Sequence, residues 1–488
     1  MNKIILIVVA LANTINVSAE SSGENNVRGK QSTKIDCQEV FSEVVQKMEA
    51  NYLGYKKMEL TNELDTYNNL KIQISSHLKN IETEQCAENI NKFTDYFKDG
   101  HLSVIEYPNH DASILKTHKE KIKQNLLSYD SLVKEIEAFK VVDEIDHIVG
   151  EYVDGVSEIA VIKEGDKKYN AYILSSTKEG ITPGELKVKL THDGKNYLGT
   201  YYSYGYQPRF VRGVLFKEKT IINFGAGALW AKTTSSFKRE VNMINKSNPQ
   251  LPTITKIDDE NVLFSIPTFS TPYKEFMNVL KENAKILKKA KNLIIDVRGN
   301  RGGNAVYFNF IGIYATTKIM PASSQGEVLA SEDTKEYYQR MSQNSKEIFG
   351  SMVTAIEKNM GAIIPGPKYV DKKIKIQRSN IQNVAILTDG ATGSAAESFI
   401  LHSKSTSNKV KTFGSPTYGM IDNTSVNSVT LKSSKNQNLL FVYPTSSMGG
   451  TNDSRHPNGY NEKGILPDVA IDEMVEDKVQ FIMDYYKK

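Results

Sequence analysis

A serine follows a strand-like apolar run and a glycine-rich bend in the last third of the chain. The string NVAILTDGATGSAAESF places Ser394 on the first turn of an expected helix. There the helix dipole favours an alkoxide or oxyanion, and the Ala395 amide faces the same place. The local pattern alone favours a serine that caps the helix, and it lacks the Gly-x-Ser-x-Gly elbow of α/β-hydrolases. Chemistry at Ser394 therefore needs support from elsewhere in the chain.

A second strand-to-helix turn has the composition of an anion cradle. The string IIDVRGNRGGN at 294–304 carries Gly299, Gly302 and Gly303, which can adopt positive φ and let backbone amides approach a ligand closely. Such amides suit a phosphate or an oxyanion. The string lacks the Lys-Ser/Thr of a P-loop, which argues against nucleotide binding.

Taken together, the two turns resemble a known family. The strings NVLFSIPTFS, NLIIDVRGNRGGN, NVAILTDGATGSAAESFI, FGSPTYGM and NEKGILPDVAID occur in the order typical of the C-terminal-processing (tail-specific) serine peptidases and their tricorn-type relatives, over roughly Asn261–Asp472. The resemblance implies a crotonase/ClpP-like catalytic domain with Ser394 as nucleophile, three residues before Glu397. It also implies an oxyanion hole made by the amide of Ala395 and that of Gly302 or Gly303.

The resemblance also bears on the base that activates the serine. The Ser-Lys branch of the family uses a lysine at the position of Met420, and methionine cannot accept a proton. The tricorn-type Ser-His branch takes a histidine from the helical region before the sheet domain, which the string KDGHLSV matches at His101. The string NEKGILPD matches the segment that brings the acid, implying that Glu462 orients the imidazole. Tricorn-type sites place a serine beside the histidine, where this chain has Gly100.

Other assignments stay open at this point. The acid could instead be Asp468 or Glu397, and His456 is the credible substitute base. His402 lies eight residues after Ser394, about 12 Å along a helix, which is too far to reach its hydroxyl. Three lysines lie nearby but outside the motif, and each is better explained as part of a solvated surface: Lys404, Lys409 and Lys411.

The elements that must position these residues suggest an α+β multidomain protein. A chain of 488 residues is too long to fold around one compact core. We predict a signal peptide over 1–19, a disordered lead-in over 20–34, an N-terminal helical bundle over 35–125, a mostly β middle domain over 126–250 and the α/β peptidase domain over 251–488.

Two local predictions matter for the site. Gly100 is expected to end the last helix of the bundle as a C′ residue, immediately before His101. The string NAVYFNFIGIYAT over 304–316 is expected to form the helix that follows the glycine turn.

Charge and cysteine content narrow the function classes. The chain has 61 Lys and Arg against 57 Asp and Glu, a net charge of +4 without a basic cluster, which argues against nucleic-acid binding. In an oxidising compartment its two cysteines, Cys37 and Cys86, could form a disulfide or remain separate buried thiols. Two cysteines without a Cys/His cluster argue against a structural zinc site.

These observations favour a secreted or periplasmic serine endopeptidase. His101 would deprotonate Ser394, which would attack a peptide carbonyl and form an acyl-enzyme, without metal or cofactor. The expected partner is a polypeptide substrate, with no nucleic acid and no integral membrane segment after signal cleavage; the sequence does not indicate an oligomeric state. The alternatives are a catalytically silent relative that binds an apolar ligand or peptide, and a serine hydrolase of non-peptide esters or amides.

Overall fold

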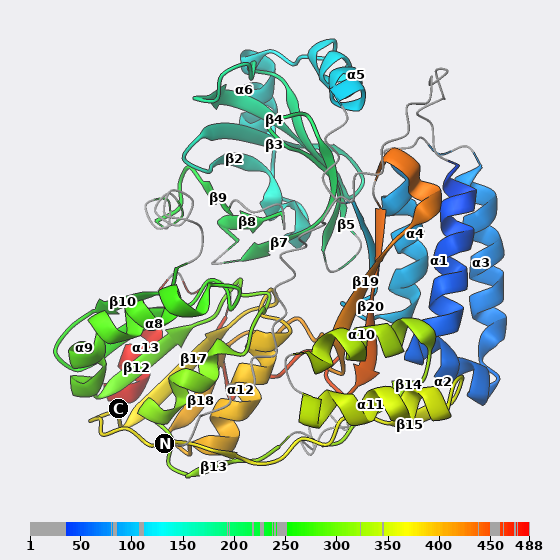
Figure 1. Cartoon of the computed structure of the whole chain (residues 1–488). Helices are drawn as coiled ribbons and strands as arrows, with labels where there is room; N and C mark the ends of the chain where they lie inside the picture. The colour runs from blue at the N-terminus through cyan, green and yellow to red at the C-terminus, as the bar shows by residue number, and fades with distance from the viewer. Residues whose placement is uncertain are drawn as a thin grey trace.

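The computed structural model describes residues 36–487, except 80, 82–84, 107–111, 193, 195, 217–218, 225–228, 237, 239–240, 242–250, 323, 344–345, 438, 449–458, 462, 473–474 and 476. The predicted signal peptide and lead-in lie outside these residues. The mixed α+β class is confirmed: the described residues form helices, an eight-stranded barrel and sheets of six, five and two strands (Figure 1).

The N-terminal part is helical because its apolar residues recur on one face. Asp36 caps the first helix by accepting from the amides of Gln38 and Glu39. Val40, Val44 and Met48, spaced by four, are fully buried. The elements here are α1 (Cys37–Asn51), α2 (Leu53–Thr61), α3 (Leu64–Leu78), α4 (Cys86–Thr94), the 3₁₀ helix η2 (Asp95–Phe97) and β1 (Ser103–Glu106).

A closed barrel forms the middle of the chain (Figure 1). Two helices and a 3₁₀ helix precede it: α5 (Ala112–Lys123), α6 (Tyr129–Ala138) and η3 (Glu144–Ile148). Its antiparallel strands are β2 (Gly150–Val153), β3 (Ser157–Gly165), β4 (Lys168–Ser176), β5 (Leu186–His192), β6 (Tyr197–Tyr202), β7 (Pro208–Phe216), β8 (Ile221–Asn223) and β9 (Leu229–Lys232). Pairing of β2 with β9 closes the barrel.

The C-terminal part contains a six-stranded sheet in the order β10-β11-β12-β17-β18-β21, parallel except for β10. Its strands are β10 (Thr253–Lys256), β11 (Asn261–Ser265), β12 (Asn292–Asp296), β17 (Asn383–Thr388), β18 (Val410–Gly414) and β21 (Val469–Ala470). Helices α8 (Tyr273–Glu282), α9 (Ala284–Lys289), α12 (Ala395–Thr406) and α13 (Lys478–Lys487) belong to this layer.

A five-stranded sheet pairs a strand that follows the helical bundle with strands from the last third of the chain. Strand β20 pairs with β1, β14 and β19, and its residues Phe441 and Tyr443 pack into the core of the helical bundle (Figure 1). The strands are β1, β14 (Glu327–Leu329), β15 (Ile363–Pro365), β19 (Asn423–Thr430) and β20 (Leu439–Ser447). The remaining elements are β13 (Ile319–Met320), α10 (Glu332–Ser342), α11 (Lys346–Lys358), β16 (Lys372–Lys373) and η6 (Lys432–Gln437).

The predicted helix over 304–316 is wrong. The segment forms only two short 3₁₀ helices, η4 (Val306–Asn309) and η5 (Ile311–Ile313). Phe310 and Tyr314 leave the helical region, with φ near −120°. Almost all of its apolar side chains are buried in the main core, and aromatic and β-branched residues have only modest helix propensity. Packing therefore decides the backbone here.

Gly100 does not end a helix. The left-handed residue after η2 is Lys98, with φ of 52°. A Cβ at Gly100 would lie 2.8 Å from Tyr418 Cε1 and 2.9 Å from Met420 Cβ, so glycine is required there for close approach to the 417–420 segment.

Candidate active site

The two glycine-rich turns lie at one edge of the parallel sheet, because the adjacent strands β12 and β17 both end there. Hydrogen bonds tie one turn to the other. The Asp389 carboxylate accepts from the Gly299 amide at 3.0 Å, and the Gly393 amide donates to Asn300 O at 2.9 Å. The structure thus brings together the two motifs that lie about a hundred residues apart in the sequence.

Gly302 permits the closest approach between these turns. Its φ is 100°, and a Cβ there would lie 2.7 Å from Ser394 Cβ and 2.8 Å from Ala395 N. Its amide donates to Asn300 Oδ1 at 2.9 Å. By contrast, among the described residues the amides of Ala395 and Gly303 have no acceptor. Of the two glycines considered as second oxyanion donor, only Gly303 has its amide available.

Ser394 precedes α12 in a strained conformation. Its φ of 54° and ψ of −120° are unusual for a residue other than glycine. Its Oγ lies 3.2 Å from His101 Nε2, a hydrogen-bonding distance between residues 293 positions apart. The sequence-predicted serine and histidine therefore meet.

The surroundings of His101 decide its tautomer. Its Nδ1 lies 3.0 Å from the backbone oxygen of Asn423, and a carbonyl can only accept. Nδ1 consequently carries the proton, which leaves Nε2 free to accept the proton of Ser394. Burial lowers the pKa of His101 below its ordinary value, while the nearby Asp99 charge and the Asn423 hydrogen bond oppose this shift.

Asp99 supports this arrangement without touching the imidazole. It is buried, and its carboxylate accepts from the His101 amide at 3.0 Å, the Tyr52 hydroxyl at 2.9 Å and the Asn423 side-chain amide at 2.7 Å. It therefore joins the segment that carries His101 to the residue that fixes its tautomer. Neither Asp99 nor Asn423 is among the residues predicted from the sequence; the available signal for Asp99 is its position two residues before the histidine.

Glu397 organises the serine side of the site. It is fully buried and accepts four hydrogen bonds, from the amides of Ser394, Gly419 and Met420 and from the Thr417 hydroxyl, at 2.5–3.0 Å. Burial raises the pKa of Glu397, and these donors act in the opposite direction. Its contacts hold the Ser394 turn against the 417–420 loop, so among the described contacts it acts on the serine and not on His101.

Met420 lies beside the serine turn. A Cβ at Gly393 would be 2.7 Å from Met420 Sδ. The three nearby lysines have other contacts: Lys404 pairs with Asp468, Lys409 donates to Ile381 O and Lys411 donates to the Tyr485 hydroxyl. The lysines are thus engaged by groups other than Ser394.

The remaining predicted residues stand as follows. Glu462 and His456 lie outside the described residues. Asp468 also accepts from Thr412. Cys37 and Cys86 are both buried in the core of the helical bundle, at the starts of α1 and α4, and the disulfide between them stays a prediction. Among the described residues, no three His, Cys, Asp or Glu side chains are arranged to hold a metal ion, and no helix is long and apolar enough to cross a membrane.

Comparison with known families decides the class of the sheet domain. Residues 262–471 match the model of peptidase family S41. This region is therefore similar to the peptidase domains of that family. Members of the family are serine peptidases, so the chain is a serine-type peptidase. The match covers both glycine turns, Ser394 and Glu397, but less than half of the chain, and His101 lies outside it. It does not favour either a carrier or a hydrolase of non-peptide substrates.

One solved structure extends the likeness in fold to most of the chain. The structure of mature CPAF complexed with lactacystin is 12% identical and superposes with a TM-score of 0.50, covering 92% of this chain and 98% of that chain. Two further structures are also 12% identical. The photosystem II D1 C-terminal processing protease has a TM-score of 0.35 over 90% of this chain and 94% of its own, and tricorn protease 0.39 over 92% and 36%. No curated protein sequence matches the chain.

Proposed function

We propose that the protein is a serine endopeptidase of the Ser-His type, in which His101 is the general base for Ser394. The observation that carries the proposal is the 3.2 Å contact between His101 Nε2 and Ser394 Oγ, with Nδ1 held by a carbonyl. A serine hydroxyl needs such a base at neutral pH. Met420 at the position of the Ser-Lys lysine further supports the Ser-His assignment.

The reaction follows from this geometry. Ser394 Oγ gives its proton to His101 Nε2 and attacks the peptide carbonyl carbon. The amides of Ala395 and Gly303 stabilise the oxyanion of the tetrahedral intermediate. His101 then donates its proton to the leaving amine, and water hydrolyses the acyl-enzyme by the reverse sequence. Because the Asn423 carbonyl already occupies Nδ1, Glu462 is proposed only to stabilise the imidazolium by its charge, and not to fix the tautomer. Secretion through the N-terminal signal peptide remains part of the proposal.

A fluorophosphonate probe tests the proposal directly. The wild-type protein should be labelled at Ser394, as located by mass spectrometry of its peptides, and should cleave an unfolded protein such as casein. Ser394→Ala and His101→Ala should each reduce labelling by about 10²-fold or more. Ser398→Ala, one helical turn after Ser394, is the matched control and should retain labelling. Undiminished labelling of Ser394→Ala would refute the assignment.

A further inference from the structure

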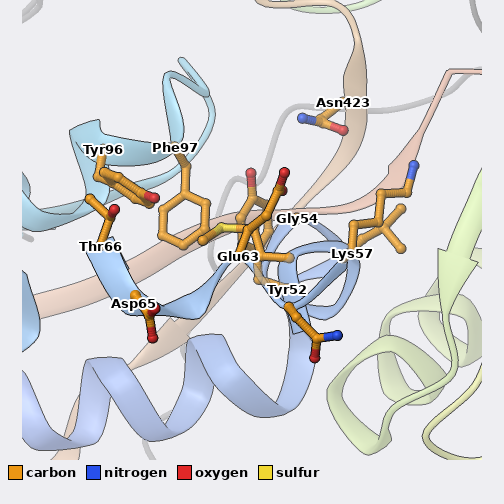
Figure 2. A pocket seen from close by; sticks show the side chains of 12 residues that line it. Tyr52, Gly54, Lys57, Glu63, Asp65, Thr66, Tyr96, Phe97 and Asn423 are labelled. Carbon is orange, nitrogen blue, oxygen red and sulfur yellow. The ribbon is translucent and has the colours of Figure 1, made fainter. Parts of the chain in front are cut away.

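A cavity of about 610 Å³ lies next to the residues that support His101. It is formed by α2, the start of α3, η2 and the first residue of β19 (Figure 2). Two of its lining residues, Tyr52 and Asn423, donate side-chain hydrogen bonds to Asp99, and the carbonyl of Asn423 accepts from His101. The cavity therefore begins next to the group that fixes the base.

The chemistry of the reaction indicates which part of the substrate lies on the His101 side of the site. The histidine that takes the serine proton passes it to the leaving amine, so the residues after the scissile bond lie toward His101. The path from Ser394 Oγ to Asn423 O consists of hydrogen bonds of 3.2 Å and 3.0 Å with the imidazole between them. Ser394 Oγ and Asn423 O are therefore at most about two to three extended residues apart, at about 3.3 Å per residue, and a substrate would pass beside the imidazole.

The walls of the cavity favour a cation. In Figure 2 the aromatic rings of Tyr96 and Phe97 lie on one side and Lys57 on the other. Glu63 and Asp65 add two carboxylates, both exposed. Lys57 is neutralised by Glu327, with its Nζ 2.6 Å from Oε2. The lining thus has an excess of negative charge beside aromatic faces, a combination that attracts lysine and arginine side chains.

Glu63 keeps acceptor capacity for such a ligand. Its Oε2 accepts from the Thr61 hydroxyl at 2.9 Å, and a carboxylate offers further lone pairs on both oxygens. An arginine or lysine side chain could lay its aliphatic stem along Met58 and Phe97 while its charged end meets the carboxylates.

From these observations we infer that the cavity is a specificity subsite for a basic residue, two or three positions after the scissile bond of a polypeptide substrate. The inference rests on the proposed function, because it takes the direction of the leaving group from the roles of Ser394 and His101. It adds a sequence preference that the catalytic residues do not themselves supply.

Peptide libraries randomised at the positions after a fixed scissile bond test the inference. In the wild type, arginine or lysine at the second or third position should raise kcat/KM about 5-fold to 30-fold over alanine, mainly through KM. The double variant Glu63→Gln with Asp65→Asn should lose most of this preference, and high salt should weaken it in the wild type. Glu63→Lys should shift the preference toward acidic residues.

The matched control is Glu59→Gln, which removes an exposed charge from the same region outside the cavity, where Glu59 pairs with Lys56. An equal loss of preference in this control, or no preference in the wild type, would overturn the subsite. Fluorophosphonate labelling separates the two proposals, because the probe has no residues after a scissile bond. An unlabelled wild type would refute the proposed function, whereas normal labelling without a basic preference would refute the subsite alone.

Discussion

Two buried carboxylates support the Ser394–His101 pair, and they hold different kinds of partner: Glu397 on the serine side and Asp99 on the histidine side. Three of the four donors to Glu397 are backbone amides, and one of these three belongs to Ser394 itself; the fourth donor is the Thr417 hydroxyl. Asp99 accepts from one backbone amide and two side chains, all around the base. The serine half of the site thus depends on a backbone clamp, and the histidine half on a side-chain network. Substitutions of Glu397 should therefore mainly lower stability, and substitutions of Asp99 should mainly change catalysis and its pH dependence.

Glu397→Ala is expected to have the largest effect. It leaves three backbone amides and a hydroxyl without their acceptor, each costing about 1–3 kcal/mol when buried, so the free energy of unfolding should fall by about 3 kcal/mol or more. Chemical denaturation followed by circular dichroism measures this. The exposed Glu282→Ala, on α8, is the control and should change stability by less than about 0.5 kcal/mol. Equal stability of both variants would remove the distinction between the two carboxylates.

Asp99→Asn should act on catalysis more than on stability. The amide nitrogen of asparagine cannot accept from Tyr52 and Asn423, so we expect the position of Asn423 to loosen and kcat/KM to fall about 10-fold. The expected loss of unfolding free energy, about 1–3 kcal/mol, is smaller than for Glu397→Ala.

The pH profile sharpens the same comparison. His101 must be neutral to act as base, and burial lowers its pKa below 6.5, so the acid limb of kcat/KM should lie below pH 6.5 in the wild type. Asp99 opposes that lowering, so Asp99→Asn should move the limb to still lower pH. A limb that stays in place or moves to higher pH would contradict the assigned effect of Asp99 on His101.

Tyr52→Phe should give the smallest effect. It removes one donor to Asp99 and leaves the other two, so we expect a loss of kcat/KM of less than about 3-fold and a loss of about 1 kcal/mol of stability. Steady-state kinetics and thermal unfolding measure both. An effect equal to that of Asp99→Asn would mean that the hydroxyl, and not the charge, is the main support of the base.

The sequence predicted the mixed α+β class and led to the serine and histidine because short motifs carried them. The glycine turns and the Ser394 string each have a composition tied to their local backbone. Asn423 could not be found this way, because its contribution is a backbone carbonyl that any residue supplies. The αL position at Lys98 was misassigned to Gly100, since glycine can be required either for its φ or for its small size.

Long-range pairing was equally hidden. The register that aligns Val104 of β1 with Phe441 of β20 joins segments more than three hundred residues apart. Nothing in the sequence of either strand identifies the strand with which it pairs. The segment 304–316 has an apolar pattern compatible with a helix, yet its side chains are buried on several sides and the backbone follows them. Tertiary packing decided both cases.

The pairing of β1 with β20 also has a consequence for biosynthesis. During translation, His101 is synthesised first, then Ser394, and β20 last. Strand β1 beside the helical bundle therefore cannot pair with the complete β20 until residue 447 has been synthesised. A chain cut between Ser394 and β20 contains both residues but lacks the strand that pairs with β1. The nascent protein therefore acquires the complete geometry only near the end of synthesis, which delays any hydrolytic competence until the chain can fold as a whole.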